Sequence, residues 1–297
     1  MLRLLPVLLV ALIVAASAGA ASKYRFGPFK DELFKTKVLA RSFGGAYMLV
    51  EFVQARDLDG RDAVPEKKAK PQYVALEVDA KQQDLVLGEG SLKVPFVAVG
   101  DITKPVKSAF IFVHGRHGNR FQGVDDWTFG GNFNRLKNLM VRNGGIYLSP
   151  GVVDAGETGT RQVRLLVNEV IKHSPKARVF IGCSSNGGKI CWNLFNEPAV
   201  AVHLGGILLL GATSGYSFVS RAPEAGDPRA VPIYVGHGNK DKVIGLKAHE
   251  RLFKTVQALR PGYPMKLVVF DGGAHGTPMR MTDWRAVLNW MLEVDGA

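Results

Sequence analysis

Two adjacent serines, Ser184 and Ser185, stand between an apolar run and two glycines in the stretch RVFIGCSSNGGKICW. An attacking serine in a strained turn from strand to helix needs small residues two positions before and two positions after it. With Ser185 as the nucleophile these positions hold Cys183 and Gly187, whereas Ser184 would place Asn186 in the second of them. The spacing therefore favours Ser185, and Ser184 stays the alternative.

A serine hydroxyl is a weak nucleophile, so it needs a base that a third group orients. Asp241 follows one apolar run in VPIYVGHGNKDKVI, and His275 follows the next in MKLVVFDGGAHGTP. We expect His275 to take the proton of Ser185 and Asp241 to hold the imidazole in the required tautomer. The alternative acids are Asp271, which is more typical of a turn, and Asp227, which follows GGILLLGATSG.

Acyl transfer also needs two backbone N–H groups that stabilise an oxyanion. The residue after the nucleophile, Asn186, provides one at the start of a predicted helix, where the helix dipole favours negative charge. The loop after SAFIFVHG provides the other, and Arg116 is the candidate. His114 is expected to shape this loop, and His237 to be structural rather than the base.

The segment RHGNRFQGVDDWTFGGNFNR places arginines among aromatic residues and glycines directly after the same run. It is either a solvated loop or a substrate-contacting loop. In the second case Arg120 or Arg116 would bind an anionic group of the substrate, and Trp127 or Phe129 would form an apolar wall.

A metal site is the competing interpretation of the same segment. His114 and His117 could combine with Asp125 and Asp126, but no third histidine follows at ligand spacing. The sequence therefore predicts neither a metal nor a cofactor.

Short apolar runs alternate with amphipathic segments after Lys107, which is typical of βαβ units and a parallel sheet. The runs are residues 108–115, 144–150, 177–183, 205–212, 231–238 and 265–273. The helices predicted between and after them are residues 132–143, 159–173, 187–196, 244–260 and 282–294. Ligands bind outside the carboxyl ends of such strands, where the candidate residues lie.

The section before residue 100 has a different residue pattern. GAYMLVEFVQA and PQYVALEVDA have the β-branched, aromatic and alternating character of strands. We expect antiparallel strands on the same sheet, with a separate small β domain as the alternative. The predicted organisation is a signal peptide over residues 1–20 and one domain over 21–297, divided into an N-terminal β section (21–100) and a catalytic core (101–297).

The motifs HGRHG, CSSNGG, GNKD and GGAHG follow successive predicted strands in this order. In this respect the chain resembles the α/β-hydrolase fold family over roughly residues 70–294. The resemblance implies a mostly parallel, doubly wound sheet and a serine hydrolase with the order Ser185, Asp241, His275. The family commonly has glycine where this chain has Cys183. About twenty residues after GGILLLGATSG are too few for a large cap, so Tyr216 and Phe218 would belong to a small flap at most.

The N-terminus MLRLLPVLLVALIVAASAGA has a basic start, an apolar run and a small-residue end, which predicts a secretory signal peptide cleaved near Ala20. An uncleaved anchor is the alternative. With two cysteines the chain cannot form a disulfide framework, so the core must supply its stability. We expect Cys183 and Cys191 to be buried free thiols, because a strand end and a helix interior are not expected to come within bridging distance. A bridge between them in an oxidising compartment is the alternative.

The formal net charge is +12, yet Lys and Arg are spread along the chain, which disfavours nucleic-acid binding. The combined expectation is an exported enzyme, periplasmic or secreted, that cleaves a small-molecule or polymeric carboxylic ester. The alternatives are a peptidase or amidase with the same triad, and a non-catalytic protein that binds an anionic envelope ligand. The sequence leaves the oligomeric state open.

Overall fold

The computed structural model describes residues 24–63, 68–215 and 230–296. The predicted signal peptide, the predicted flap and Asp227 therefore lie outside the described residues.

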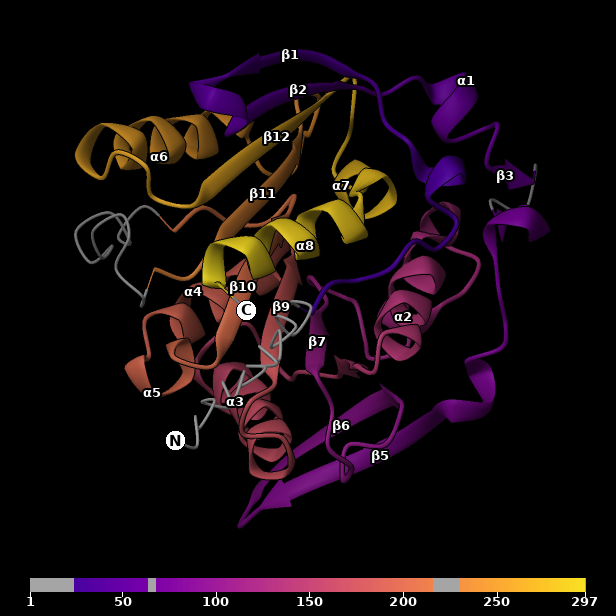
Figure 1. The fold of residues 1–297 in the computed structure, drawn as a ribbon, viewed down its shortest axis with the longest axis vertical. Coiled ribbons are helices and arrows are strands. Elements are labelled where there is room, and N and C mark those ends of the chain that lie inside the picture. Colours follow the sequence, from indigo (N-terminus) through magenta and orange to yellow (C-terminus); the bar gives the residue numbers. More distant parts are fainter. Residues whose placement is uncertain (1–23, 64–67, 216–229, 297) are drawn as a thin grey trace, which may run out of the picture.

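In the described residues, ten strands form one large sheet across the molecule (Figure 1). They are β1 (Val38–Ser42), β2 (Tyr47–Glu51), β5 (Gln82–Glu89), β6 (Leu92–Val99), β7 (Ser108–Val113), β8 (Ile146–Pro150), β9 (Arg178–Ser184), β10 (Leu204–Leu210), β11 (Ile233–Gly238) and β12 (Met265–Asp271). Their order is β1-β2-β12-β11-β10-β9-β7-β8-β6-β5. The strands from β2 to β8 in this order are parallel, and antiparallel pairing occurs at both edges. The six predicted apolar runs are all strands of this sheet.

Helices cover both faces of the sheet. The longer ones are α2 (Asn132–Arg142), α3 (Glu157–His173), α4 (Gly188–Phe195), α6 (Leu246–Leu259) and α8 (Trp284–Asp295), and the short ones are α1 (Gln54–Asp57), α5 (Pro198–Ala201) and α7 (Thr277–Met281). A two-stranded sheet joins β3 (Asp62–Ala63) and β4 (Lys68–Ala69). Among the described residues we find no helix with the length and hydropathy needed to span a membrane.

The side chains of β9 show why the central strands appear as apolar runs. Val179 and Ile181 belong to the core that α3, α4 and α6 cover, whereas Phe180 between them belongs to the core under α2 and α8. Both faces of the strand are buried, so consecutive positions are apolar instead of alternating with polar ones.

The prediction of a strand at PQYVALEVDA was wrong. This segment contains two 3-10 turns, at Pro71–Tyr73 and Asp79–Lys81, and the strands follow at Gln82–Glu89 and Leu92–Val99. Pro71 starts the first turn, where its missing N–H costs nothing. β5 is an edge strand with mostly exposed side chains, so it lacks the apolar run that marks a buried strand.

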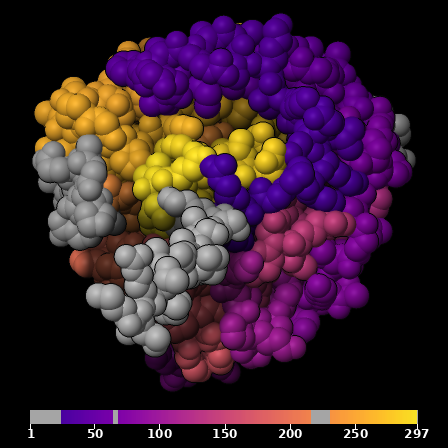
Figure 2. Space-filling view, viewed as in Figure 1, coloured from indigo at the N-terminus to yellow at the C-terminus, as the bar shows by residue number. Residues whose placement is uncertain are grey.

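Buried ion pairs tie the N-terminal section to the rest of the domain. Arg135 of α2 is fully buried and its Nη2 contacts Asp31 at 2.9 Å and Asp283 at 3.1 Å. Nζ of the equally buried Lys137 contacts Asp79 at 3.0 Å. On the face shown in Figure 2, the N-terminal section in indigo lies beside the C-terminal helices in yellow.

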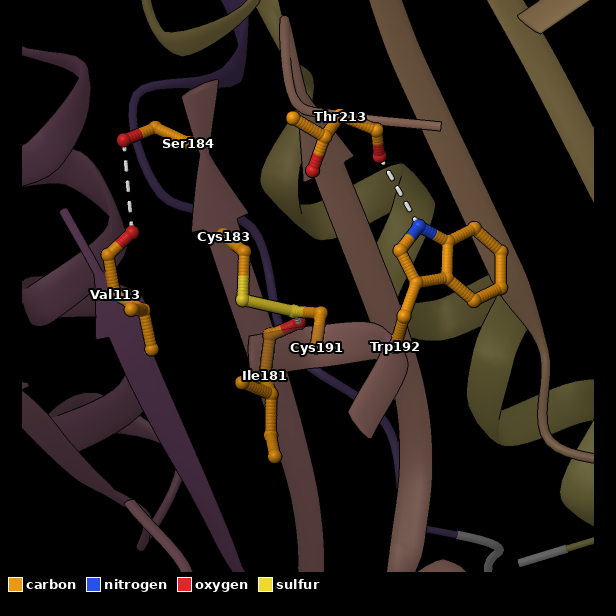
Figure 3. Close-up of a disulfide and its surroundings, with 7 residues drawn as sticks. All are labelled: Val113, Ile181, Cys183, Ser184, Cys191, Trp192 and Thr213. Atoms are coloured by element: carbon orange, nitrogen blue, oxygen red, sulfur yellow. Dashed lines mark hydrogen bonds between the residues drawn. A yellow bond between two sulfur atoms is a disulfide. The ribbon is translucent and has the colours of Figure 1, made fainter. Parts of the chain in front are cut away.

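Cys183 and Cys191 form a disulfide, which corrects the expectation of free thiols (Figure 3). Their Cα atoms are 6.2 Å apart, within the range that a disulfide requires. The reason is the sharpness of the turn between them: α4 folds directly back against β9, so that a strand end and a helix interior eight residues apart become neighbours. Both cysteines are fully buried in the core.

Removing this cross-link is expected to lower the free energy of unfolding by about 2 to 3 kcal/mol, because it restores conformational entropy to a short loop of the unfolded chain. Urea unfolding with and without reductant measures the effect. The midpoint of the wild type should fall on reduction, and that of the Cys183→Ala/Cys191→Ala variant should not respond. Two reactive thiols in denatured protein without reductant would contradict the bridge.

Candidate active site

Ser185 lies in the turn between β9 and α4 with a backbone φ of 49°. Non-glycine residues seldom adopt this left-handed conformation, and it persists only where surrounding contacts impose it. Ser184 is the last residue of β9, is extended, and is buried to 2% exposure. The strained residue of the pair is therefore Ser185, the one that the spacing favours.

Two glycines allow the loop after β7 to approach this turn closely. A Cβ added at Gly187 would lie 2.6 Å from the His114 carbonyl oxygen, and one added at Gly115 would lie 2.7 Å from Ser185 Cβ. Both distances are shorter than a real Cβ contact, so a larger residue at either position would push the loop and the turn apart. The contact of Gly115 with Ser185 was not predicted from the sequence.

Asp241 and His275 form a hydrogen-bonded pair at the ends of neighbouring strands. His275 Nδ1 lies 2.7 Å from Asp241 Oδ2, and the Asp241 side chain is fully buried while that of His275 is 27% exposed. The other oxygen, Oδ1, accepts hydrogen bonds from the N–H groups of Val243 (2.7 Å) and Ile244 (3.0 Å). The carboxylate is thus fixed from both sides.

The charge of Asp241 follows from these contacts. Burial by itself would raise the pKa of this carboxyl, but the hydrogen bonds from the Ile244 N–H, from His275 and from the Val243 N–H bring the pKa below its usual value. Asp241 is therefore ionised at neutral pH and accepts the Nδ1 proton of His275. This tautomer leaves Nε2 of His275 with a lone pair that can accept a proton.

The segment after β10 connects the pair to Ser185. The Thr213 N–H donates to the Ser185 carbonyl oxygen at 3.0 Å. A Cβ added at Gly211, two residues earlier, would lie 2.8 Å from the His275 carbonyl oxygen and 3.6 Å from Asp241 Oδ2. Among the described residues no hydrogen bond joins the Ser185 hydroxyl to His275. Catalytic hydrogen bonds are often long in an enzyme without substrate and shorten when substrate binds.

The two predicted oxyanion donors, Arg116 and Asn186, both line one pocket of about 300 Å³. Among the described residues, neither of their N–H groups donates to a protein acceptor. His114 is buried, and its Nδ1 lies 2.8 Å from the Gly115 carbonyl oxygen, so it holds the turn of this loop. The pocket is lined by His114, Gly115, Arg116, His117, Gly118, Val152, Val153, Asp154, Ala155, Asn186 and Gly187.

The two residues predicted to bind substrate, Arg120 and Trp127, do not line this pocket. Arg120 makes a two-pronged ion pair with Asp84 of β5, with distances of 2.7 and 2.8 Å. The backbone of Trp127 is tied into its own loop by Asp125 and accepts a hydrogen bond from the Ala69 N–H. The structure thus brings Arg116, and not Arg120, to the pocket.

The carboxylates of the alternative metal site serve other contacts. Asp125 accepts the N–H groups of Trp127 and Thr128, and Asp126 pairs with Lys137 at 2.7 Å. Across the part of the chain that the structure describes, no three His, Cys, Asp or Glu side chains are grouped so that they could hold a metal ion.

Two buried histidines, His237 and His249, pack behind Asp241 with ring centroids 4.6 Å apart. Nε2 of His237 lies 2.8 Å from the Ile244 carbonyl oxygen, and Nε2 of His249 lies 2.7 Å from that of Ala212. Burial lowers the pKa of both rings, that of His249 to about 4. Both rings are therefore neutral at neutral pH, and they pack against the loop that carries Asp241. The apolar positions 252, 253 and 256 on the helix of His249 are the sequence signal for its burial.

The low pKa of His249 predicts a loss of stability in acid. Below pH 6.5 the unfolded chain takes up a proton at this residue while the folded chain does not, until the pH approaches 4. The free energy of unfolding should thus fall by about 2 kcal/mol from this residue between pH 7 and pH 4.5. His249→Gln, which keeps a donor for Ala212, should weaken the dependence. Chemical denaturation at the two pH values tests this, and equal losses in both proteins would contradict it.

No protein-family model and no curated protein matches the chain. Solved structures with a similar fold include a thermostable esterase, a Pyrococcus furiosus esterase and a dienelactone hydrolase from Anabaena variabilis. Their identities to this chain are 14%, 12% and 13%, and their TM-scores are 0.57, 0.52 and 0.52. The similarity covers 73%, 71% and 71% of this chain and 64%, 91% and 97% of theirs, so the chain spans less than two thirds of the thermostable esterase.

At these identities the comparison concerns the fold. The mostly parallel sheet, its antiparallel edges and the helices on both faces are shared, so this protein has the α/β-hydrolase fold. The fold class predicted from the order of motifs is confirmed.

Proposed function

We propose that this protein is a serine hydrolase that cleaves a carboxylic ester through an acyl-enzyme. The observation that carries the proposal is the 2.7 Å hydrogen bond between His275 and the buried Asp241, beside the segment after β10 whose Thr213 N–H donates to the carbonyl oxygen of the left-handed Ser185. The similar structures named as esterases and a dienelactone hydrolase support the same class of reaction.

In this mechanism Ser185 attacks the ester carbonyl as His275 Nε2 takes its proton. The ionised Asp241 stabilises the imidazolium that forms. The oxyanion accepts hydrogen bonds from the N–H groups of Arg116 and Asn186, which have no protein acceptor among the described residues. His275 then protonates the leaving alcohol as its bond to the carbonyl carbon breaks. In the second half His275 takes a proton from water, which attacks the acyl-enzyme, and returns it to the Ser185 oxygen as the carboxylic acid leaves.

We further propose that the protein is exported, on the strength of its N-terminal residues 1–20. The substrate would be a small or polymeric ester of the periplasm or the surroundings. A peptidase or amidase would use the same residues, and a binding protein of the same fold would use none of them.

A fluorophosphonate probe followed by peptide mapping tests the nucleophile. The expected result is one adduct on Ser185 in folded protein and none after denaturation. No adduct would refute the serine hydrolase, and an adduct on Ser184 would shift the nucleophile by one residue.

The reaction class needs a second assay with 4-nitrophenyl carboxylic esters, anilides and phosphate esters. We expect turnover of the carboxylic esters to exceed that of the other two classes. Faster cleavage of anilides would favour an amidase, and faster cleavage of phosphate esters would refute acyl transfer.

A further inference from the structure

Arg116 is exposed and is one of the residues that line the pocket beside the predicted oxyanion hole. Among the described residues, none forms an ion pair or a side-chain hydrogen bond with it. Other arginines near the loop are engaged: Arg120 pairs with Asp84 at 2.7 Å, and Arg280 pairs closely with Asp62 at 2.6 Å. Arg116 is therefore a guanidinium that is available to a ligand.

The carboxylate in the same pocket does not neutralise Arg116. Asp154 Oδ1 accepts the N–H groups of Gly156 at 2.7 Å and Gly159 at 3.1 Å. The N–H groups of Gly159 and Gly156 lower the pKa of Asp154, so this carboxylate is ionised at neutral pH and bonded to the backbone at the start of α3. Within residues 24–63, 68–215 and 230–296, Arg116 has no ion-pair partner, so it is the group of this pocket with which an anionic ligand can pair.

The lining of the pocket indicates a second property of its ligand. Val152 and Val153 line it together with the polar residues, so an apolar chain has a surface to contact. Arg116 is both a lining residue of this pocket and, through its backbone N–H, a predicted oxyanion donor.

We propose that this pocket binds a carboxylate carried by the ester substrate, and that the guanidinium of Arg116 recognises it by a charge-assisted, two-pronged hydrogen bond. The inference rests on the proposed function, because it names the substrate class of the same site. The substrate would be a half-ester of a dicarboxylic acid, or an ester whose alcohol carries the carboxylate.

Two pairs of esters distinguish a carboxylate on the acyl part of the substrate from one on the alcohol part. The acyl pair is mono-4-nitrophenyl adipate and its neutral carboxamide analogue, and the alcohol pair is 3-carboxyphenyl acetate and 3-carbamoylphenyl acetate. Within each pair only the charge changes substantially. The measured quantity is the ratio of kcat/KM for the carboxylate to kcat/KM for the carboxamide. We expect a ratio of at least about ten in one pair, since a charged hydrogen bond contributes about 1.5 to 3 kcal/mol.

Variants of Arg116 test the residue. Arg116→Gln retains the backbone N–H and should lower the ratio about tenfold, and Arg116→Lys should retain part of it because the charge remains. Arg251→Gln removes an exposed charge on α6, away from the pocket, and should leave the ratio unchanged. An unchanged ratio in Arg116→Gln, or a wild-type ratio near one in both pairs, would overturn the inference while turnover of the carboxamide esters upheld the proposed function.

A binding measurement keeps the inference testable if no ester is cleaved. In ligand-observed NMR, the signals of adipate monoamide should broaden with wild-type protein and broaden much less with Arg116→Gln, and those of neutral adipamide should respond to neither. Equal broadening with both proteins would refute the anion site. No cleavage together with Arg116-dependent broadening would refute the hydrolase and uphold the site.

Discussion

Replacing Ser185 with alanine is expected to lower kcat for a carboxylic ester by about 10⁴- to 10⁶-fold and to leave KM little changed. In the proposed mechanism the hydroxyl forms the covalent bond of the acyl-enzyme, whereas the pocket and the proposed oxyanion donors do not depend on it. Steady-state kinetics with a 4-nitrophenyl ester measures the effect, and circular dichroism verifies that the variant is folded.

Ser184→Ala is the matched control for this variant. The Ser184 hydroxyl is buried, and its contact with the Val113 carbonyl oxygen is long, at 3.5 Å (Figure 3). We therefore expect a change in kcat of about threefold or less, since no strong interaction is lost. If Ser184→Ala abolished turnover and Ser185→Ala did not, the nucleophile would be the other serine.

Asp241→Asn is expected to lower kcat by about 10⁴-fold. The asparagine amide would not accept the Nδ1 proton as a carboxylate does, and it offers its own N–H to His275, so the ring is held in the wrong tautomer. The N–H groups of Val243 and Ile244, which now donate to Asp241 Oδ1, would still position the side chain. The loss should therefore appear in kcat more than in KM.

Asp271→Asn separates this effect from the general loss of a carboxylate in the same region. Asp271 ends β12, is exposed, and accepts a hydrogen bond from Asn239 Nδ2 at 2.8 Å. It was an alternative acid from the sequence, but the carboxylate that accepts the hydrogen bond of His275 Nδ1 is that of Asp241. We expect nearly wild-type kcat for Asp271→Asn. If its kcat were as low as that of Asp241→Asn, Asp241 could not be assigned as the acid that orients His275.

Two predictions from local residue patterns were wrong, one in the N-terminal section and one for the two cysteines. The segment PQYVALEVDA, predicted as a strand, contains two 3-10 turns. Its apolar side chains indicate burial, but whether a buried segment is a strand or a turn depends on the other segments that pack against it. The bridge between Cys183 and Cys191 depends on the angle at which α4 leaves β9, and residue types in the stretch do not specify that angle. Both errors concern geometry that more than one segment determines.

The choice between the two loop arginines has the same origin. Arg116 and Arg120 have similar neighbours in the sequence, so either could be predicted to bind an anionic group of the substrate. Asp84, which engages Arg120, lies 36 residues away on an edge strand that has no apolar signature. Only the fold shows which guanidinium is already paired.

The sequence by itself determined the fold class and the order of the candidate triad. Parallel strands that are buried on both faces appear as apolar runs, and the residues that follow each run must meet at one edge of the sheet. The tertiary structure alone decided the disulfide beneath the turn, the pairing of Arg120 with Asp84 and the lack of an ion-pair partner for Arg116 among the described residues. Each of these depends on contacts between segments far apart in the chain or on the angle of a turn, and neither is contained in local residue patterns.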